Sequence, residues 1–320
     1  MRASPSRREF IKHTALLPLG VAAGIVAASA PRAVAASPIP RVAGPKLKLS
    51  LNAFSFNQLL LDGLQGKKPG MSLFELLEFC AEHDFEAIDP TGYYFPGYPE
   101  VPEDAFINRF KRRAFQLGLD ISGTGIRNDF ATPDAAKRAA DVQRAKAWIE
   151  VAARMGAPVL RLFAGAVPAG YENKWDEVAR WMADAFRECA SHGEKFGVLV
   201  GVQNHGDMLK DADQTIRVLD LIDSAWCGVI VDTGNMATPD PYADIARVVP
   251  YAVNWQVKTS PRGPNGAERT DLPRLIRIIR EGGYRGYLPI ETLAAEGKPY
   301  DPHVLVPQFA ADVRAAMAAR

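Results

Sequence analysis

The sequence predicts a single (β/α)8 TIM barrel of class α/β, and three observations lead to this fold. From Leu47 onward, eight short apolar runs alternate with helical patterns, which is typical of a parallel sheet covered by helices. The 320 residues show no second composition regime that would mark another domain. The first run, LNAFSFN, contains no glycine-rich phosphate loop, so the alternative of a doubly wound open sheet is disfavoured.

The expected elements follow one another along the whole chain. Short runs rich in Val and Ile are typical of strands that are buried on both faces. We expect strands near 48–53, 86–89, 119–124, 158–163, 198–203, 228–232, 252–257 and 287–291. We expect helices near 72–83, 103–117, 133–155, 174–195, 211–222, 241–248, 271–281 and 304–318. Gly156 is a typical helix stop, and Pro273 suits the first turn of the seventh helix.

The N-terminal segment has the features of an export signal. Arg7 and Arg8 precede an apolar, small-residue run near 14–30, and an A-x-A pattern ends at Ala35. These features predict a twin-arginine signal peptide over 1–35, followed by a flexible leader over 36–46 and the barrel domain over 47–320. We therefore expect an exported, periplasmic protein with no stable membrane span after cleavage. The alternative is that the apolar run is kept as an anchor.

The composition limits the classes of partner. The chain is 48% hydrophobic and 23% charged, with a formal net charge of +1. This is an ordinary globular composition without the basic surplus expected of a protein that binds nucleic acid. The expected partner is a small-molecule substrate, and assembly of the chain into a homo-oligomer is a further alternative.

Four apolar runs in the second half of the chain each end in a side chain that carries oxygen. These residues are Gln203, Asp232, Gln256 and Glu291, at spacings of 29, 24 and 35 residues. Because the carboxyl ends of parallel strands meet at one mouth of a barrel, we expect the four side chains to converge. Four oxygen ligands, two of them carboxylates, suit a hard divalent cation such as Mn²⁺ or Mg²⁺. The alternative is a polar pocket without a metal, in which amides and carboxylates bind a ligand by hydrogen bonds.

Further polar residues are expected around the same mouth as substrate-binding groups. Arg161 lies within a strand run, so it either clamps a substrate oxygen or forms a structural ion pair with an acid such as Asp232. Tyr94 belongs to an aromatic loop whose rings either pack against the C–H face of a bound substrate or only pack within the loop. The expected substrate-binding set is Asn52, Arg127, Arg161, Asn204, Asn235 and Tyr94.

At these strand ends the chain resembles the xylose isomerase-like barrels, a group of sugar isomerases, sugar epimerases and related lyases. The resemblance covers about 47–318. The family pattern places Glu, Asp, His and Glu after strands 5 to 8, where together they hold one divalent metal. Asp232 and Glu291 match this pattern, whereas Gln203 stands in place of the first Glu and Gln256 in place of the His.

The two replacements alter the chemistry that the resemblance implies. In the epimerase members, two Glu residues are thought to act from opposite faces of the substrate, but a glutamine cannot exchange a proton at neutral pH. Glu291 remains as a base. The proton partner is expected to be Lys258, through a lowered pKa, or His205.

The sequence therefore predicts an exported, divalent-metal-dependent sugar isomerase or epimerase that abstracts a proton next to a carbonyl. One alternative is a keto-sugar or keto-glycoside lyase or hydratase on the same barrel, which needs only one base and one acid. The other is a carbohydrate-binding barrel that has lost its chemistry.

Overall fold

The protein is represented by a computed structural model that describes residues 37–319, except 206–207, 261, 264–265 and 295–298. The predicted signal peptide over 1–35 lies outside the described residues.

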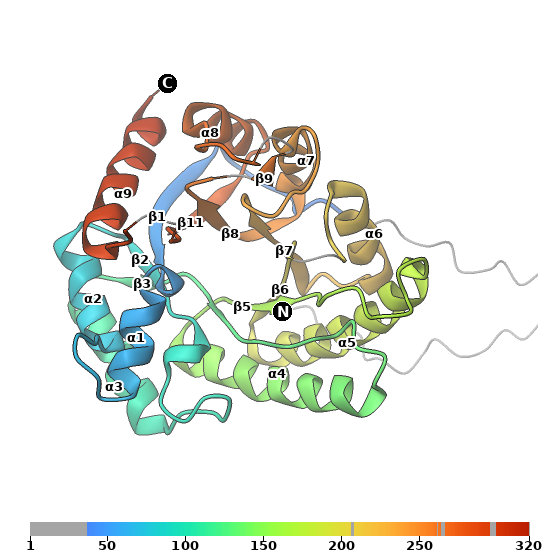
Figure 1. The fold of residues 1–320 in the computed structure, drawn as a ribbon, viewed down its shortest axis with the longest axis horizontal. Helices are drawn as coiled ribbons and strands as arrows, with labels where there is room; N and C mark the ends of the chain where they lie inside the picture. The colour runs from blue at the N-terminus through green and yellow to red at the C-terminus, as the bar shows by residue number, and fades with distance from the viewer. Residues whose placement is uncertain (1–36, 206–207, 261, 264–265, 295–298, 320) are drawn as a thin grey trace, which may run out of the picture. The chain divides into compact units, whose positions relative to one another are not determined.

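Parallel strands form a barrel, and the helices lie around its outside (Figure 1). The sheet order is β3-β2-β1-β11-β8-β7-β6-β5-β4. The two end members of this order, β3 and β4, are two pieces of one predicted strand, so the sheet closes on itself at this strand. An isolated bridge between Thr91, just after β2, and Gly125 of β4 also joins the two ends. The barrel strands are β1 (Lys46–Asn52), β2 (Ala87–Asp89), β3 (Asp120–Ile121), β4 (Thr124–Gly125), β5 (Val159–Phe163), β6 (Leu199–Gln203), β7 (Cys227–Asp232), β8 (Ala252–Lys258) and β11 (Arg285–Glu291). The predicted fold class is confirmed.

The predicted helices correspond to α2–α9, with boundaries that differ by no more than two residues. Their bounds are α2 (Leu73–Glu82), α3 (Asp104–Gln116), α4 (Ala135–Met155), α5 (Trp175–Phe196), α6 (Ala212–Ile222), α7 (Pro241–Val248), α8 (Leu272–Glu281) and α9 (Pro302–Ala318). A short helix that was not predicted, α1 (Asn57–Leu64), follows the 3-10 turn at the end of β1. Among the described residues, no helix is long and apolar enough to cross a membrane.

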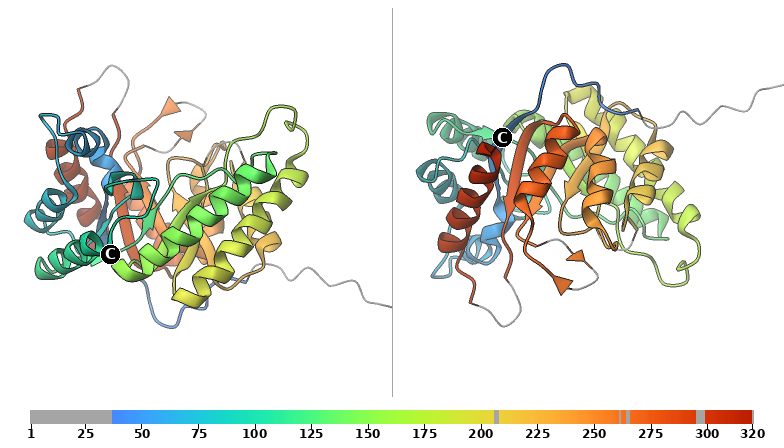
Figure 2. Two further views of the ribbon diagram at one scale, coloured as in Figure 1. Left: turned by 90° about the horizontal axis from the view of Figure 1, so that it is seen from below. Right: turned by 90° about the horizontal axis from the view of Figure 1, so that it is seen from above.

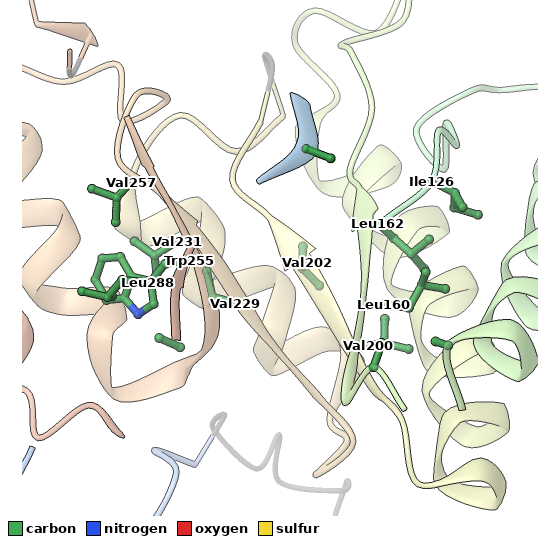
Figure 3. Close-up of a cluster of buried hydrophobic side chains, with 14 of the residues drawn as sticks. Ile126, Leu160, Leu162, Val200, Val202, Val229, Val231, Trp255, Val257 and Leu288 are labelled. Atoms are coloured by element: carbon green, nitrogen blue, oxygen red, sulfur yellow. The ribbon is translucent and has the colours of Figure 1, made fainter. Parts of the chain in front are cut away.

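Side chains along the strands alternate between two environments, as the two-residue period of a strand requires. Leu160 and Leu162, for example, point out into the apolar layer between strands and helices, where Trp255 also lies (Figure 3). The intervening residues face the barrel interior, which holds buried polar side chains such as Ser50, Ser122 and Asn254. There, the hydroxyls of Ser50 and Ser122 lie 2.7 Å apart. The same alternation brings the polar strand ends to the mouth.

The two ends of the barrel differ in what covers them. At the amino end of β8, the Ile39 amide donates to the Pro250 carbonyl (2.9 Å), and the Arg41 guanidinium donates to the Ala252 carbonyl (2.7 Å). These contacts hold part of the predicted leader against the barrel. At the other end, the hairpin of β9 (Arg262–Gly263) and β10 (Gly266–Ala267) projects beyond the carboxyl end of β8 (Figure 2).

Candidate active site

A cavity of about 510 Å³ opens at the carboxyl ends of the strands. Its volume lies in the range usual for small-molecule sites. It is lined by Asn52, Phe54, Thr91, Tyr93, Arg127, Asn128, Asp129, Arg161, Phe163, Gly165, Ala166, Gln203, His205, Gln256, Lys258 and Glu291. Three of the four predicted strand-end residues therefore reach this cavity, while Asp232 lies fully buried behind its surface.

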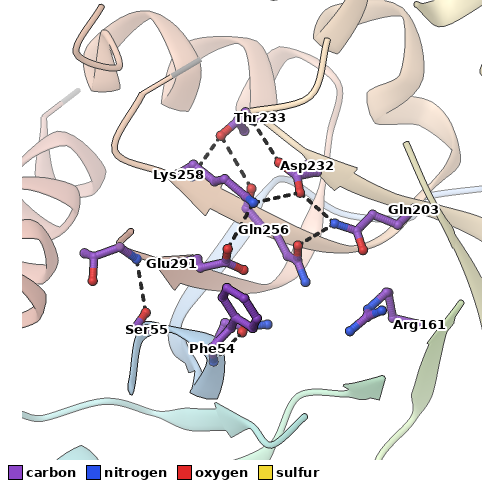
Figure 4. Close-up of polar contacts among 12 residues, drawn as sticks. Phe54, Ser55, Arg161, Gln203, Asp232, Thr233, Gln256, Lys258 and Glu291 are labelled. Atoms are coloured by element: carbon purple, nitrogen blue, oxygen red, sulfur yellow. Dashed lines mark hydrogen bonds and ion pairs between the residues drawn. The ribbon is translucent and has the colours of Figure 1, made fainter. Parts of the chain in front are cut away.

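Two buried carboxylates share one ammonium group at the mouth (Figure 4). The Lys258 Nζ lies 3.3 Å from Asp232 Oδ2 and 3.0 Å from Glu291 Oε1. Asp232 is 0% exposed, Glu291 is 3% exposed and the Lys258 side chain is 13% exposed. Buried charges of this kind persist only when they are paired, so the three side chains form one charge cluster.

An amide donor completes the cluster. The Gln203 side-chain nitrogen donates to Asp232 Oδ2 and to Gln256 Oε1, both at 2.6 Å. Turning the amide over would place its oxygen against the Asp232 carboxylate, so this orientation is the favourable one. Gln203 therefore presents hydrogens to Asp232, and its own buried Oε1 has no partner among the described atoms.

Asp232 is held in place by residues that directly follow β6 and β7. The Asn204 side chain donates to the Asp232 carbonyl (3.0 Å) and accepts from the Asp232 amide (2.8 Å). The Gly234 amide donates to Asp232 Oδ1 (2.9 Å). Asn204 and Asn235 were expected to bind substrate, but neither residue lines the cavity. Asn204 aligns the two strand ends instead.

The backbone and side chain of Lys258 are also fixed. The Thr233 hydroxyl accepts from the Lys258 amide (2.9 Å), and the Thr270 hydroxyl donates to the Lys258 carbonyl (2.6 Å). A Cβ at Gly234 would lie 2.6 Å from Lys258 Cδ. Glycine at 234 therefore leaves the space that the lysine stem occupies.

Burial and the charges of the cluster together shift the pKa values of Glu291 and Lys258. Burial is the main cause that raises the pKa of Glu291 above its ordinary value, against the opposing attraction of the Lys258 ammonium. For Lys258, burial is the largest single influence and acts downward, but the combined attraction of Asp232 and Glu291 raises the pKa above its ordinary value. This is opposite to the lowered pKa expected from the sequence. Lys258 therefore remains an ammonium throughout the physiological pH range.

Arg161 reaches the cavity from β5. Its guanidinium donates to the Ile126 carbonyl (2.9 Å) and to the Tyr93 hydroxyl (3.0 Å), and it lies 4.1 Å from the Phe163 ring centroid. Within the described ranges, the ion-pair partner of Asp232 is Lys258 and not Arg161. A structural ion pair between Arg161 and Asp232 is therefore not formed, while the Arg161 charge acts on the buried Asp89 carboxyl and opposes the rise of its pKa.

Tyr93 and Tyr94, in the aromatic loop after β2, lie in different environments. Tyr94, expected to bind substrate, is buried, and its hydroxyl donates to Asn57 (2.9 Å) on α1. Tyr93 lines the cavity in its place. The direction of each ring depends on the 3-10 turn at 92–94 and on the unpredicted helix α1, so the sequence carried no signal that could tell the two apart.

The remaining predicted residues do line the cavity. Asn52 does so while its side-chain oxygen accepts from the Phe54 amide (2.9 Å). Arg127 lies above the Tyr93 ring, 4.9 Å from its centroid, and the His205 ring lies 4.6 Å from the ring of Phe163. Thr91 and Phe163 were not among the predicted site residues, and Tyr93 was expected only as one ring of the aromatic loop.

The family resemblance implies a divalent metal at these strand ends. Within the described ranges, no group of three or more His, Cys, Asp or Glu side chains is placed to hold a metal ion. The two carboxylates are present, but an ammonium lies between them, and Gln203 turns its hydrogens toward Asp232. Arranged in this way, the residues do not fit a divalent cation.

Comparison with solved structures identifies the same architecture in sugar-processing proteins. A D-psicose 3-epimerase from Clostridium cellulolyticum H10, solved with D-tagatose, is 14% identical, with a TM-score of 0.64 over 84% of this chain and 96% of that one. A 3-keto-D-glucoside 4-epimerase from E. coli is 14% identical, with a TM-score of 0.63 over 85% and 99%. A xylose isomerase domain protein from Planctomyces limnophilus is 16% identical, with a TM-score of 0.59 over 86% and 99%. No curated protein matches the sequence.

The family comparison covers most of the chain. The family described as "Xylose isomerase-like TIM barrel" matches residues 77–308, which run from α2 to α9 and include the whole charge cluster. On this match, together with the barrel topology, the chain belongs to the xylose isomerase-like TIM barrel family.

Proposed function

We propose that this protein is a sugar isomerase/epimerase-like enzyme that abstracts a proton from the carbon next to the carbonyl of a ketose or keto-sugar. One observation carries the proposal: Glu291, a buried carboxylate with a raised pKa, lines the cavity beside the Lys258 ammonium. A base with a raised pKa is better matched to proton abstraction near neutral pH. An adjacent fixed cation stabilises the oxyanion that forms. Membership of the family supports the substrate class.

The cavity residues divide into base, oxyanion partner and substrate contacts. Glu291 takes the proton, and the Lys258 ammonium donates hydrogen bonds to the carbonyl oxygen as it becomes an enolate. The Tyr93 and Phe163 rings offer apolar faces to sugar C–H groups. The Arg161 guanidinium, held between these two rings, is placed to bind a substrate hydroxyl or carboxylate.

The fate of the proton decides the reaction class. Return to the former carbonyl carbon, with passage of the hydroxyl proton to the former carbonyl oxygen, gives isomerisation, and return to the same carbon from the opposite face gives epimerisation. Glu291 lies at the end of β11, and His205 lies just after β6, with two strands between β11 and β6 in the sheet order. Both residues line the cavity, so they approach a bound substrate from different strands. His205 is therefore the proposed second proton carrier.

A second candidate is a keto-sugar or keto-glycoside lyase or hydratase. Gln203 favours it, because both hydrogens of this amide are engaged and the residue has no proton to exchange. Loss of a β-oxygen after proton abstraction needs one general acid to protonate the leaving oxygen, but no second carboxylate on the opposite face.

A screen of ketoses, keto-acids of sugars and 3-keto-glycosides tests the proposal. Products analysed by NMR would separate the classes: a new epimer or aldose supports the isomerase/epimerase, and an unsaturated keto-sugar supports the lyase. Saturable binding of a sugar with no product from any substrate would favour the carbohydrate-binding barrel and contradict both enzyme proposals.

We also propose that the enzyme acts outside the cytoplasm. The motif around Arg7 and Arg8 and the apolar run that follows it support a twin-arginine signal with cleavage after Ala35. This export route carries folded proteins, so the barrel would reach the periplasm already assembled.

A further inference from the structure

The charge cluster holds its own cation where the family pattern implies a metal. The Lys258 Nζ lies within 3.3 Å of both buried carboxylates, and no more than 13% of its side chain is exposed. A divalent ion that used Asp232 and Glu291 as ligands would have to occupy this same space. It would also meet the ammonium at a distance of a few ångströms, where like charges repel strongly.

The lysine is built into this position by its surroundings. Thr233 and Thr270 fix the backbone on both sides of the residue. Gly234 leaves the room that the aliphatic stem needs, since a Cβ there would lie 2.6 Å from Lys258 Cδ. The position of the ammonium therefore follows from packing as well as from attraction to the acids.

The side-chain amides of Gln203 and Gln256 are not arranged as metal ligands around the position of the Lys258 ammonium. An amide side chain can ligate a metal only through its oxygen, yet Gln203 presents its nitrogen to Asp232 and to Gln256. The Gln256 oxygen is thereby engaged as an acceptor. The Gln203 nitrogen is thus bonded to Asp232 and to Gln256, while the Gln203 Oε1 has no partner among the described atoms, so the two amide oxygens do not face a common ion.

We propose that the Lys258 ammonium is the resident cation of this centre, in place of the divalent metal, and that it binds the substrate carbonyl oxygen. The first part rests on the charge cluster alone, and the second rests on the proposed function. Lys258 is then a catalytic residue that acts as an electrostatic partner and not as a proton carrier. The predicted dependence on Mn²⁺ or Mg²⁺ is replaced by dependence on this side chain.

The test measures Mn²⁺ binding without any substrate, so its result is separate from the proposed activity. Protein from Mn²⁺-supplemented medium is passed through gel filtration and its metal content is determined. Calorimetric titration with MnCl₂ then compares the wild type with Lys258→Ala, which leaves both carboxylates and removes the cation. The matched control is Lys146→Ala, which removes an ammonium from Glu188 on the outer helices.

The wild type is expected to carry less than about 0.1 equivalent of metal, and Lys258→Ala to bind Mn²⁺ at least about tenfold more tightly than the wild type. Lys146→Ala should behave as the wild type. About one equivalent of metal in the wild type would overturn the proposal, even if Lys258→Ala failed to fold. Equal Mn²⁺ affinity of folded Lys258→Ala and wild type would overturn it as well.

Discussion

The Nζ of Lys258 lies 3.0 Å from Oε1 of Glu291, so a fixed positive charge and a candidate base stand side by side at the mouth of the barrel. The pair is closed off from behind by Asp232 and is open to the cavity in front. A substrate carbonyl oxygen bound to the ammonium would bring its neighbouring carbon near the carboxylate. This juxtaposition links the local geometry to proton abstraction next to a carbonyl.

Gln203→Glu should destabilise the protein. The change removes both hydrogen bonds of the amide and buries a third carboxylate against Asp232. We expect the free energy of unfolding to fall by about 3 kcal/mol at neutral pH, measured by urea denaturation. Gln308→Glu, which adds the same charge at an exposed position of α9, is the matched control and should change stability little. Unchanged stability of Gln203→Glu would show that this position tolerates a carboxylate.

Asp89 should make stability depend on pH. Burial raises the pKa of Asp89 to about 7, although the attraction of Arg161 opposes the shift. Because the folded state then binds the proton more tightly than the unfolded chain, stability should fall as pH rises from about 4 to about 7 and level off above that. The loss would be on the order of 4 kcal/mol at most. Asp89→Asn should remove this component, so parallel pH profiles for the two proteins would contradict the assignment.

Gly125→Ala should displace the Arg161 guanidinium. A Cβ at Gly125 would lie 2.6 Å from Arg161 Nε, so the side chain would have to move from its contacts with Ile126 and Tyr93. If Arg161 clamps the substrate, KM should rise about tenfold, with a smaller change in kcat. Gly44→Ala, at a position with open space around the added methyl, is the control. An unchanged KM for a folded Gly125→Ala protein would argue against the clamp.

Export should depend on the arginine pair. Replacing Arg7 and Arg8 together by lysine should leave the precursor in the cytoplasm, as judged by cell fractionation and immunoblotting. Arg2→Lys is the matched control within the same segment and should be exported normally. Periplasmic accumulation of the Arg7/Arg8 double variant would contradict the twin-arginine route.

The barrel could be predicted because each strand is a short apolar run that can be recognised from its own residues, without knowledge of the rest of the structure. The runs ending at Gln203, Asp232, Gln256 and Glu291 correspond to β6, β7, β8 and β11. Parallel strands bring such ends together whatever the details of the helices. The convergence of these positions on one buried cluster therefore follows from topology.

The position of the Lys258 ammonium between the two carboxylates could not be predicted in the same way. Lys258 follows Gln256 by two residues, so the alternation of a strand places both on the inner face, but it does not say where the ammonium goes. That depends on the space left by Gly234 and on the distances to two acids from other strands. The direction of the Lys258 pKa shift is the result of this three-way contact. Likewise, the choice of Tyr93 over Tyr94 depends on contacts with α1.

The most direct measurement is solvent deuterium exchange at the carbon next to the carbonyl of a bound ketose or keto-glycoside, followed by NMR in D₂O. Exchange is common to isomerase, epimerase and lyase chemistry, so it does not depend on which product forms. We predict that the wild type catalyses exchange and that Glu291→Gln slows it by about 10²–10⁴-fold, while the exposed control Glu281→Gln exchanges at the wild-type rate. Wild-type exchange that persists undiminished in folded Glu291→Gln would contradict proton abstraction by this carboxylate.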